Sequence, residues 1–227
     1  MKFTATALGL LATIATTNAA MSACSKKIAL GLTNIYENGD TAFHYDYCEN
    51  IHDGRGKYDA VMKKLDKSGS GSTSGLDGYC SVWGKLGKSD AKFRAAQDKV
   101  RDEMYFDPSQ KLADTLGAQL DVTRAQLYDT TIQHGDGSDP DSVACRFKAD
   151  AKGSSGSTLK INGHNVDEIV WLTKFLQNPH NKETQKEWSE SVTRVKSYQY
   201  VVAQKQYKWS NSIKALDNDG KATTVKC

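Results

Sequence analysis

The sequence predicts a mostly α-helical protein, and two observations carry that prediction. Only three prolines occur in 227 residues, which leaves room for long uninterrupted helices. Apolar residues recur at helical spacing in several segments, and helix-starting residues stand in front of some of them. An all-β sandwich of this length would need more chain-breaking residues. The length fits one domain or a small two-lobed unit with a substantial core.

The first twenty residues predict a secretory signal peptide. Lys2 gives a positive start, residues 7–15 form an apolar stretch, and the small residues at Ala19 and Ala20 suit a signal peptidase. A membrane anchor is the alternative, but the apolar run is shorter than the about 20 residues that a spanning helix needs. We therefore expect residues 1–20 to be removed and residues 21–227 to be secreted as an extracellular protein with no membrane partner.

Five cysteines remain after that cleavage, and no two of them form a CxxC pair: Cys24, Cys48, Cys80, Cys145 and Cys227. This spacing argues against a zinc ribbon and against a thioredoxin-type redox site. In an oxidising compartment we expect two disulfides and one leftover thiol. The sequence leaves the pairing open.

The first predicted helix covers Ser25 to Glu37 and ends near Asn38-Gly39, because Ile28, Leu32 and Ile35 share one face. Glu37 lies in its last turn, the unfavourable end of the helix dipole for a carboxylate, and this placement needs a reason. A second helix is expected over Thr41 to Ile51, followed by a tight turn at residues 53–56.

Further along the chain, Tyr58, Met62 and Leu65 predict a helix that stops at Lys67, and Ser68 to Gly75 reads as a flexible surface loop. Other helices are expected over residues 89–106, from Asp107-Pro108 to about Gln133, and over residues 166–176 and 183–206. Gly153 to Gly163 is expected to be a polar loop.

Charge and motifs exclude several function classes. Thirty Lys and Arg against 27 Asp and Glu give a formal charge of +3 with no basic stripe, so nucleic acid is not an expected partner. The chain contains no GxSxG, HExxH, P-loop or GxGxxG motif. Four Trp and ten Tyr suit a carbohydrate-active domain, although core packing is the favoured role for any single aromatic residue, so composition alone identifies no substrate.

Two blocks point to a family. The stretches Asn34-Ile35-Tyr36-Glu37-Asn38 and Tyr45-Asp46-Tyr47-Cys48-Glu49-Asn50-Ile51-His52-Asp53-Gly54-Arg55-Gly56 resemble the catalytic signature of glycoside hydrolase family 46, the endo-chitosanases. Further blocks follow in family order at residues 57–76, 101–108, 127–137 and 139–140, and looser ones at residues 167–168, 193–195 and 208–209. The combination is specific although each block alone is weak.

The resemblance implies a lysozyme-like, two-lobed fold joined by a long helix. It also implies an inverting endo-chitosanase that works as a monomer on chitosan, without metal or cofactor. By that resemblance Glu37 is the general acid and Asp53 the general base. An inverting pair needs carboxyl groups about 6.5 to 9.5 Å apart, with room for a water molecule between the base and the sugar.

The resemblance and the chemistry of a cationic substrate suggest further site residues. Arg55 is expected to orient the catalytic carboxylate and keep it ionised, although a structural turn arginine is the alternative. Tyr47 could offer its ring or hydroxyl to a sugar. Glu49, Asp129, Asp136 and Asp139 are available to bind ammonium groups, whereas His134 is expected to be structural. Overall charge does not steer a polycation, so any acidic lining must be local.

The sequence departs from the family in one place. After Gly56 the family pattern continues with a segment that contains a water-positioning Thr, a glucosamine-binding Asp and a Cys, whereas here Lys57-Tyr58 follows at once. A sixth Cys would also make the count even. Two functions from different classes therefore follow: an active endo-chitosanase, or a catalytically impaired relative that only binds chitosan. A lysozyme-type hydrolase of another polymer rests on fold alone.

Overall fold

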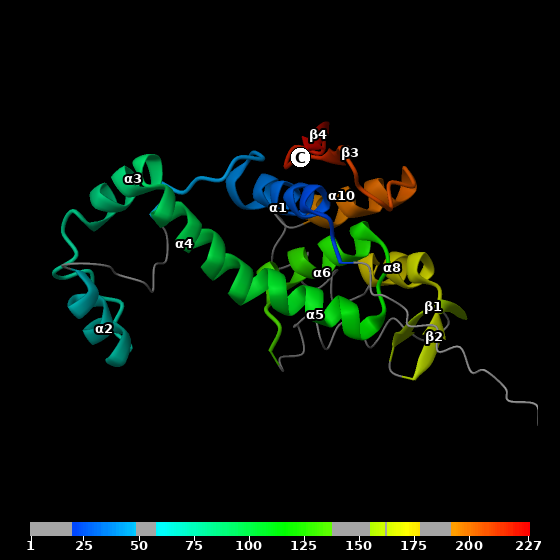
Figure 1. Cartoon of the computed structure of the whole chain (residues 1–227), viewed down its shortest axis with the longest axis horizontal. Coiled ribbons are helices and arrows are strands. Elements are labelled where there is room, and N and C mark those ends of the chain that lie inside the picture. Colours follow the sequence, from blue (N-terminus) through cyan, green and yellow to red (C-terminus); the bar gives the residue numbers. More distant parts are fainter. Residues whose placement is uncertain (1–19, 49–57, 138–154, 162, 178–191) are drawn as a thin grey trace, which may run out of the picture.

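The structure is a computed structural model, and it describes residues 20–48, 58–137, 155–161, 163–177 and 192–227. It is mostly helical, as predicted. Helices α2 (Asp59–Lys67) and α3 (Tyr79–Ser89) form a small lobe on one side, and helix α4 (Ala91–Arg101) runs from it to the rest of the molecule (Figure 1). The large lobe holds the other elements. No helix among these residues is both long and apolar enough to cross a membrane.

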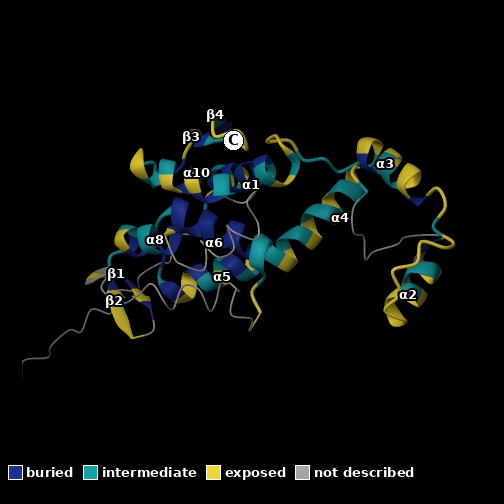
Figure 2. Ribbon diagram, turned by 180° about the vertical axis from the view of Figure 1, so that it is seen from behind, coloured by how far each residue is buried: buried dark blue, intermediate teal, exposed yellow. Residues whose placement is uncertain are grey.

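Helix α6 (Asp121–His134) lies at the centre of the large lobe and is buried on every side over residues 121–131 (Figure 2). Around it pack α1 (Ala23–Asn38), α5 (Asp107–Leu116), α8 (Glu168–Leu176) and α10 (Val192–Ala203). Their apolar side chains form one core, in which Ile28, Leu127 and Trp171 are fully buried. This core is the rigid support for whatever α1, α6 and α10 present at the surface.

Helix α1 matches its prediction closely. The Ser22 hydroxyl accepts the backbone N–H of Ser25 at the start of the helix. Gly39 has a left-handed backbone, with φ 86°, and its N–H closes the helix onto the carbonyl of Ile35. The predicted apolar face is buried. Glu37 consequently stands in the last turn of a helix whose two ends are both fixed.

The link between the lobes is a continuous helical rod with one irregular turn. Asp90 caps α4 by accepting the N–H groups of Lys92 and Phe93. A π-helical turn, η2 (Asp102–Phe106), follows α4 and leads without a break into α5. The helix predicted over residues 89–106 is therefore confirmed, whereas its π-helical turn was not predicted. Such turns often mark functional positions, because they widen the helix locally.

The single long helix predicted from Asp107 to Gln133 is wrong. Gly117, with a left-handed φ of 73°, ends α5, and α6 begins only at Asp121. The Glu168 carboxylate accepts the N–H groups of Gln119 and Leu120 between the two helices. A distant side chain thus satisfies backbone groups that a continuous helix would have satisfied itself.

The small lobe is held by aromatic rings instead of a large apolar core. Tyr58, Tyr79, Trp83 and Phe93 contact one another in sequence, with ring centroids 4.6–6.0 Å apart. Helix α2 ends at Lys67, as predicted, and residues 68–75 are exposed, as expected for a surface loop. Helix α3 was not predicted.

Two further predictions fail in the described residues. Residues 41–48 are not helical; the Asp40 carboxylate accepts the N–H of Ala42 and turns the chain there. The expected loop at residues 153–163 contains strand β1 (Ser155–Ile161), which pairs antiparallel with β2 (His164–Val166) and buries Leu159 and Ile161. Helices α8 and α10 confirm the last two predicted helices, although residues 183–191 lie outside the described part.

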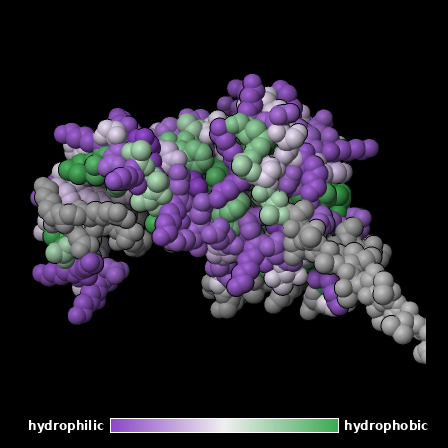
Figure 3. All heavy atoms as spheres, in the orientation of Figure 1, coloured by the Kyte–Doolittle hydropathy of each residue, from purple (hydrophilic) through white to green (hydrophobic). Residues whose placement is uncertain are grey.

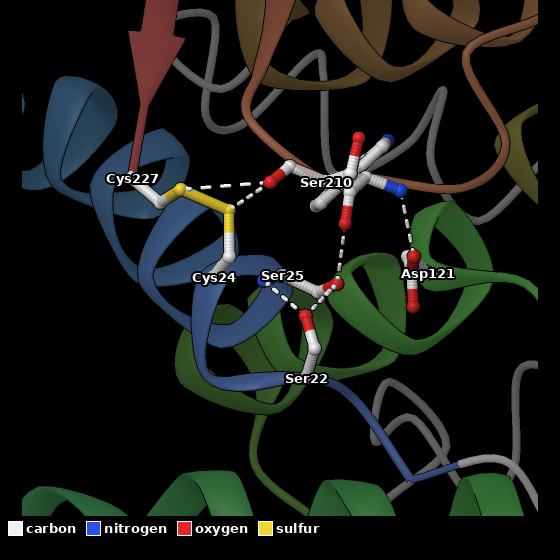
Figure 4. Close-up of a disulfide and its surroundings, with 7 residues drawn as sticks. Ser22, Cys24, Ser25, Asp121, Ser210 and Cys227 are labelled. Atoms are coloured by element: carbon white, nitrogen blue, oxygen red, sulfur yellow. Dashed lines mark hydrogen bonds between the residues drawn. A yellow bond between two sulfur atoms is a disulfide. The ribbon is translucent and has the colours of Figure 1, made fainter.

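Two disulfides are present, as expected. Cys24 at the start of α1 bonds to Cys227, which follows the hairpin of β3 (Ser212–Leu216) and β4 (Ala222–Lys226) (Figure 4). Beside this disulfide, the Ser25 hydroxyl donates to the carbonyl of Trp209, and the Asp121 carboxylate accepts the backbone N–H of Trp209. The second disulfide joins Cys48 to Cys80 of α3. Cys145 lies outside the described residues.

Candidate active site

Glu37 is the predicted general acid, and its side chain is 43% exposed at the end of α1. One oxygen of its carboxylate accepts a hydrogen bond from the guanidinium of Arg194 on α10. This cation offsets the unfavourable interaction between a carboxylate and the C-terminal end of a helix. The ion pair with Arg194 explains why a carboxylate is stable in the last turn of this helix. The Glu37 carboxyl group is held by Arg194 and is still partly exposed, so it can contact a bound molecule.

Arg194 also pairs with Asp129, which lies on the buried side of its guanidinium. The guanidinium Nε lies 3.0 Å from the Asp129 carboxylate, which also accepts the hydroxyl of Thr33 at 2.8 Å. Burial lowers the pKa of Arg194, but Asp129 and Glu37 outweigh burial and raise it, so the guanidinium stays charged. The three charges therefore form a line from the core, through Arg194, to the exposed carboxylate of Glu37.

Asp129 does not fit the predicted contact with a sugar. It is fully buried on α6, and its carboxylate faces Arg194 and Thr33. Complete burial raises the pKa of the Asp129 carboxyl, while Arg194 and Thr33 oppose that shift. The Asp129 carboxylate therefore contacts Arg194, which in turn contacts Glu37.

Arg194 is the functional residue that the sequence reasoning missed. In the sequence it lies in the loosely matching block at residues 193–195, and no role was predicted for it. A signal was available, because Arg194, Tyr198 and Val201 share one face of the helix and the other two are apolar core residues. A buried arginine on such a face needs an acidic partner.

Tyr47 is exposed, as a sugar-contacting residue should be. Its ring stacks on His44, with centroids 4.3 Å apart and planes 15° from parallel, and 48% of the residue is exposed. His44 in turn contacts the Asp40 carboxylate at 3.0 Å. The ring of Tyr47 is thus backed by a second ring, an arrangement that suits stacking against the face of a sugar.

The remaining predicted site residues lie outside the described part of the chain: Glu49, Asp53, Arg55 and Asp139. The structure describes the chain up to Cys48, so residues 43–48, directly before Glu49, are the nearest described segment. This segment runs along the small lobe and ends at the Cys48–Cys80 disulfide. His134, expected to be structural, is the last residue of α6.

A separate hollow of about 580 Å³ lies against η2, α5 and the turn after α6. Asp107, Lys111 and Asp136 are among its lining residues. Asp136, one of the available acidic residues, therefore faces a concave surface. Glu37 is not part of that lining.

The arrangement around Glu37 supports proton transfer. An exposed carboxyl on a rigid helix end can deliver a proton to a leaving oxygen within hydrogen-bond reach. The buried Arg194–Asp129 pair fixes its orientation, so that reaching the productive geometry costs little further ordering.

Known proteins are similar to this chain in sequence and in fold. The sequence model of glycosyl hydrolase family 46 matches residues 57–212. The chitosanase of Bacillus subtilis strain 168 is 36% identical over 233 residues, which cover 86% of this chain and 82% of that protein. The crystal structure of a native chitosanase from Bacillus subtilis MY002 superposes with a TM-score of 0.73 at 33% identity, over 91% of this chain and all of the other.

A mutant of the Bacillus subtilis MY002 enzyme, complexed with 6 GlcN, superposes with a TM-score of 0.72 at 33% identity, over 91% of this chain and all of the other. The two-lobed arrangement is thus the lysozyme-like fold that the resemblance implied. The catalytic type is also clear, because the family consists of glycoside hydrolases. On both the sequence and the structural evidence, this chain belongs to glycosyl hydrolase family 46.

Proposed function

We propose that this protein is a secreted endo-chitosanase that cleaves β-1,4 linkages between glucosamine residues of chitosan. The observation that carries the proposal is the half-exposed carboxyl of Glu37, anchored by Arg194 and Asp129 in a family 46 fold. The similar enzymes named chitosanases, one of them complexed with 6 GlcN, support chitosan as the substrate.

In the proposed mechanism, Glu37 protonates the glycosidic oxygen while Asp53 removes a proton from a water that attacks the anomeric carbon from the opposite face. The product then has the inverted configuration. Proton NMR of the first products would show the α-anomer before mutarotation. A first-formed β-anomer would exclude inversion.

Substrate binding is proposed to combine one stacking surface with local negative charge. Tyr47, backed by His44, would stack on a sugar ring, and the acidic residues Glu49 and Asp139 would bind ammonium groups. Arg55 would hold the general base ionised. Tyr47→Ala should raise KM for chitosan more than it lowers kcat. An unchanged KM would remove Tyr47 from the binding site.

A second candidate function, a chitosan-binding relative with impaired catalysis, is favoured by two observations. The alignment with the Bacillus subtilis chitosanase spans 233 positions, more than the 227 residues of this chain, so it includes positions with no residue here. The family model begins to match at Lys57, directly after the point where the sequence predicts a missing segment. Without a water-positioning Thr, hydrolysis by Asp53 should be slow.

The deciding experiment compares this chain with a version in which the family segment is restored between Gly56 and Lys57. Reducing-sugar release from one chitosan preparation should be far faster for the restored chain, which should also bind chitosan more tightly and have one fewer free thiol. Equal rates would show that other residues replace the lost ones. Sequencing the transcript across Gly56-Lys57 establishes whether the deletion is present in the message.

The acid role is tested separately. Glu37→Gln should abolish hydrolysis with an unchanged far-UV circular dichroism spectrum, because glutamine cannot donate the proton. Asp219→Asn, at an exposed turn of the C-terminal hairpin, is the matched control and should keep full activity. If Glu37→Gln retained more than about a tenth of the rate, Glu37 would not be the general acid.

Secretion and a monomeric state complete the proposal. Both disulfides suit an oxidising compartment. On the face seen in Figure 3, hydrophilic residues predominate and hydrophobic ones gather in small separate patches, which suits a protein that acts alone. Detection of residues 21–227 in the medium, eluting at monomer size, would support both; retention inside the cell would exclude secretion.

A further inference from the structure

A chain of polar contacts crosses from the large lobe to the small lobe at the π-helical turn. Lys26 of α1 donates to Asp102 of η2 at 2.7 Å. Asp102 also accepts from Arg101 at 2.9 Å, and Arg101 donates to Asp98 of α4 at 2.8 Å. Asp98 finally accepts the hydroxyl of Tyr45 at 3.0 Å. These five side chains join α1, η2, α4 and the segment at residues 43–48.

Apolar and cationic contacts accompany this polar chain. The Lys26 ammonium lies 4.2 Å from the ring centroid of Phe106, and the Arg101 guanidinium lies 5.2 Å from that of Phe43. Phe43 also packs against the small cluster of Leu30, Phe106 and Tyr128 in the large lobe. The contacts are half-buried, so they are screened less than a surface ion pair would be.

The segment at residues 43–48 is fastened to the small lobe by further contacts. The Gln97 amide donates to the Tyr45 carbonyl at 3.0 Å. Gly87 of α3 lies so close that a Cβ there would come within 2.2 Å of the same carbonyl oxygen. Lys88 pairs with Asp46, and Cys48 is bonded to Cys80. The chain therefore leaves Glu37 on the large lobe and lies along the small lobe up to Cys48.

We infer that the contact chain Lys26–Asp102–Arg101–Asp98–Tyr45 holds the segment at residues 43–48, which precedes the proposed general base Asp53 in the sequence, in place relative to Glu37. The inference rests on the proposed function. Its five members are positioning residues, since none of them is assigned to contact the substrate. A misplacement of about 1 Å between reacting groups can cost up to about 100-fold in rate.

The test uses two pairs of variants. Lys26→Met keeps the aliphatic stem over Phe106 and removes the charge. Lys99→Met is its matched control, because Lys99 also pairs with a carboxylate of η2, Glu103, but at the exposed surface and within the same helical rod. Asp102→Asn removes the charge of the second member of the contact chain. Tyr45→Phe removes the hydroxyl group at its end.

We expect kcat on chitosan to fall about tenfold in Asp102→Asn and about threefold to fivefold in Lys26→Met and Tyr45→Phe, with KM changed less than about twofold. Lys99→Met should match the wild-type chain. Thermal unfolding, measured on each variant, separates misplacement from loss of the fold. The double variant Lys26→Met/Asp102→Asn should lose less than the product of the single losses, because both break one chain.

Hydrogen–deuterium exchange gives a readout that does not depend on activity. Peptides covering residues 41–48 should exchange faster in Asp102→Asn and Tyr45→Phe, and at the wild-type rate in Lys99→Met. If the wild-type chain releases no sugar, the proposed function fails while this exchange result still tests the inference. The inference would be overturned if all variants had the wild-type kcat and the wild-type exchange rate. It would also be overturned if Lys99→Met lost as much kcat as Lys26→Met.

Discussion

Glu37 and the segment at residues 43–48 are held in place in opposite ways. Glu37 rests on the packed core of the large lobe and is anchored by the buried pair of Arg194 and Asp129. Residues 43–48 rest on the small lobe, where half-buried polar contacts, one close glycine and a disulfide do the same work. Figure 2 shows the contrast: α6 is buried over most of its length, whereas α2 and α3 are mostly exposed or intermediate.

This difference indicates a division of roles. Glu37 is anchored by a buried ion pair, which salt screens little. Residues 43–48 depend on a few part-buried contacts across the link between the lobes, so their position can be changed by mutation without unfolding the core. The following variants test that comparison.

The largest effect is expected from the disulfides. Removing Cys24–Cys227 frees a loop of 203 residues, and removing Cys48–Cys80 frees one of 32. The chain-entropy relation assigns them about 5 and about 4 kcal/mol of unfolding free energy. Well below the unfolding temperature, however, the Cys48→Ser/Cys80→Ser variant should lose more activity. Guanidinium unfolding and chitosan hydrolysis measure the two effects; a larger activity loss in the Cys24→Ser/Cys227→Ser variant would contradict the comparison.

The next effect comes from the buried ion pair. Asp129→Ala leaves Arg194 buried with only Glu37 beside it, and breaking such a pair costs about 3–5 kcal/mol. Urea unfolding should show that loss, together with loss of hydrolysis. Asp219→Ala, at an exposed turn, should change stability by less than about 0.5 kcal/mol. A cost below about 1 kcal/mol for Asp129→Ala would mean that burial does not anchor the acid.

A smaller effect is expected where α3 meets residues 45–46. Gly87→Ala would force a methyl group against the Tyr45 backbone, at a cost of about 1–3 kcal/mol. Gly84→Ala, one turn earlier, would place its Cβ at 3.6 Å from the Asp46 carbonyl, an ordinary contact, and should be neutral or stabilising by up to about 1 kcal/mol. Thermal unfolding of both variants measures the difference. The same melting point for both would show that the approach at Gly87 is easily relaxed.

The smallest effect is an alkaline one. Burial, followed by Asp98, raises the pKa of Tyr45 from 10.0 to about 12. The unfolded chain therefore loses this proton first, so the stability that Tyr45 contributes is complete below pH 10 and is lost as the pH rises through about 12. Unfolding midpoints should fall less steeply over this range in Tyr45→Phe. Parallel curves would place Tyr45 in solvent.

Much of this architecture could be predicted from local sequence. The apolar spacing and capping residues of α1 gave its bounds, and therefore placed Glu37 in the last turn before Gly39. The count of cysteines and the signal-like N-terminus predicted two disulfides. The spacing of Tyr58, Met62 and Leu65 predicted α2. In each case the information lies within a few residues of the element, where hydrogen bonds and side-chain faces are local.

Tertiary structure decided the rest, because the deciding contacts join residues far apart in the chain. Arg194 meets Glu37 across 157 residues, and only that meeting shows that Asp129 supports the acid instead of touching a sugar. Residues 41–48 do not form the predicted helix, because Asp40 and Gln97 supply hydrogen bonds that replace helical ones, and Gly87 lets α3 approach the backbone closely. The π-helical turn likewise has partners on α1. No local periodicity encodes such pairings, since they form only when packing brings separate elements together.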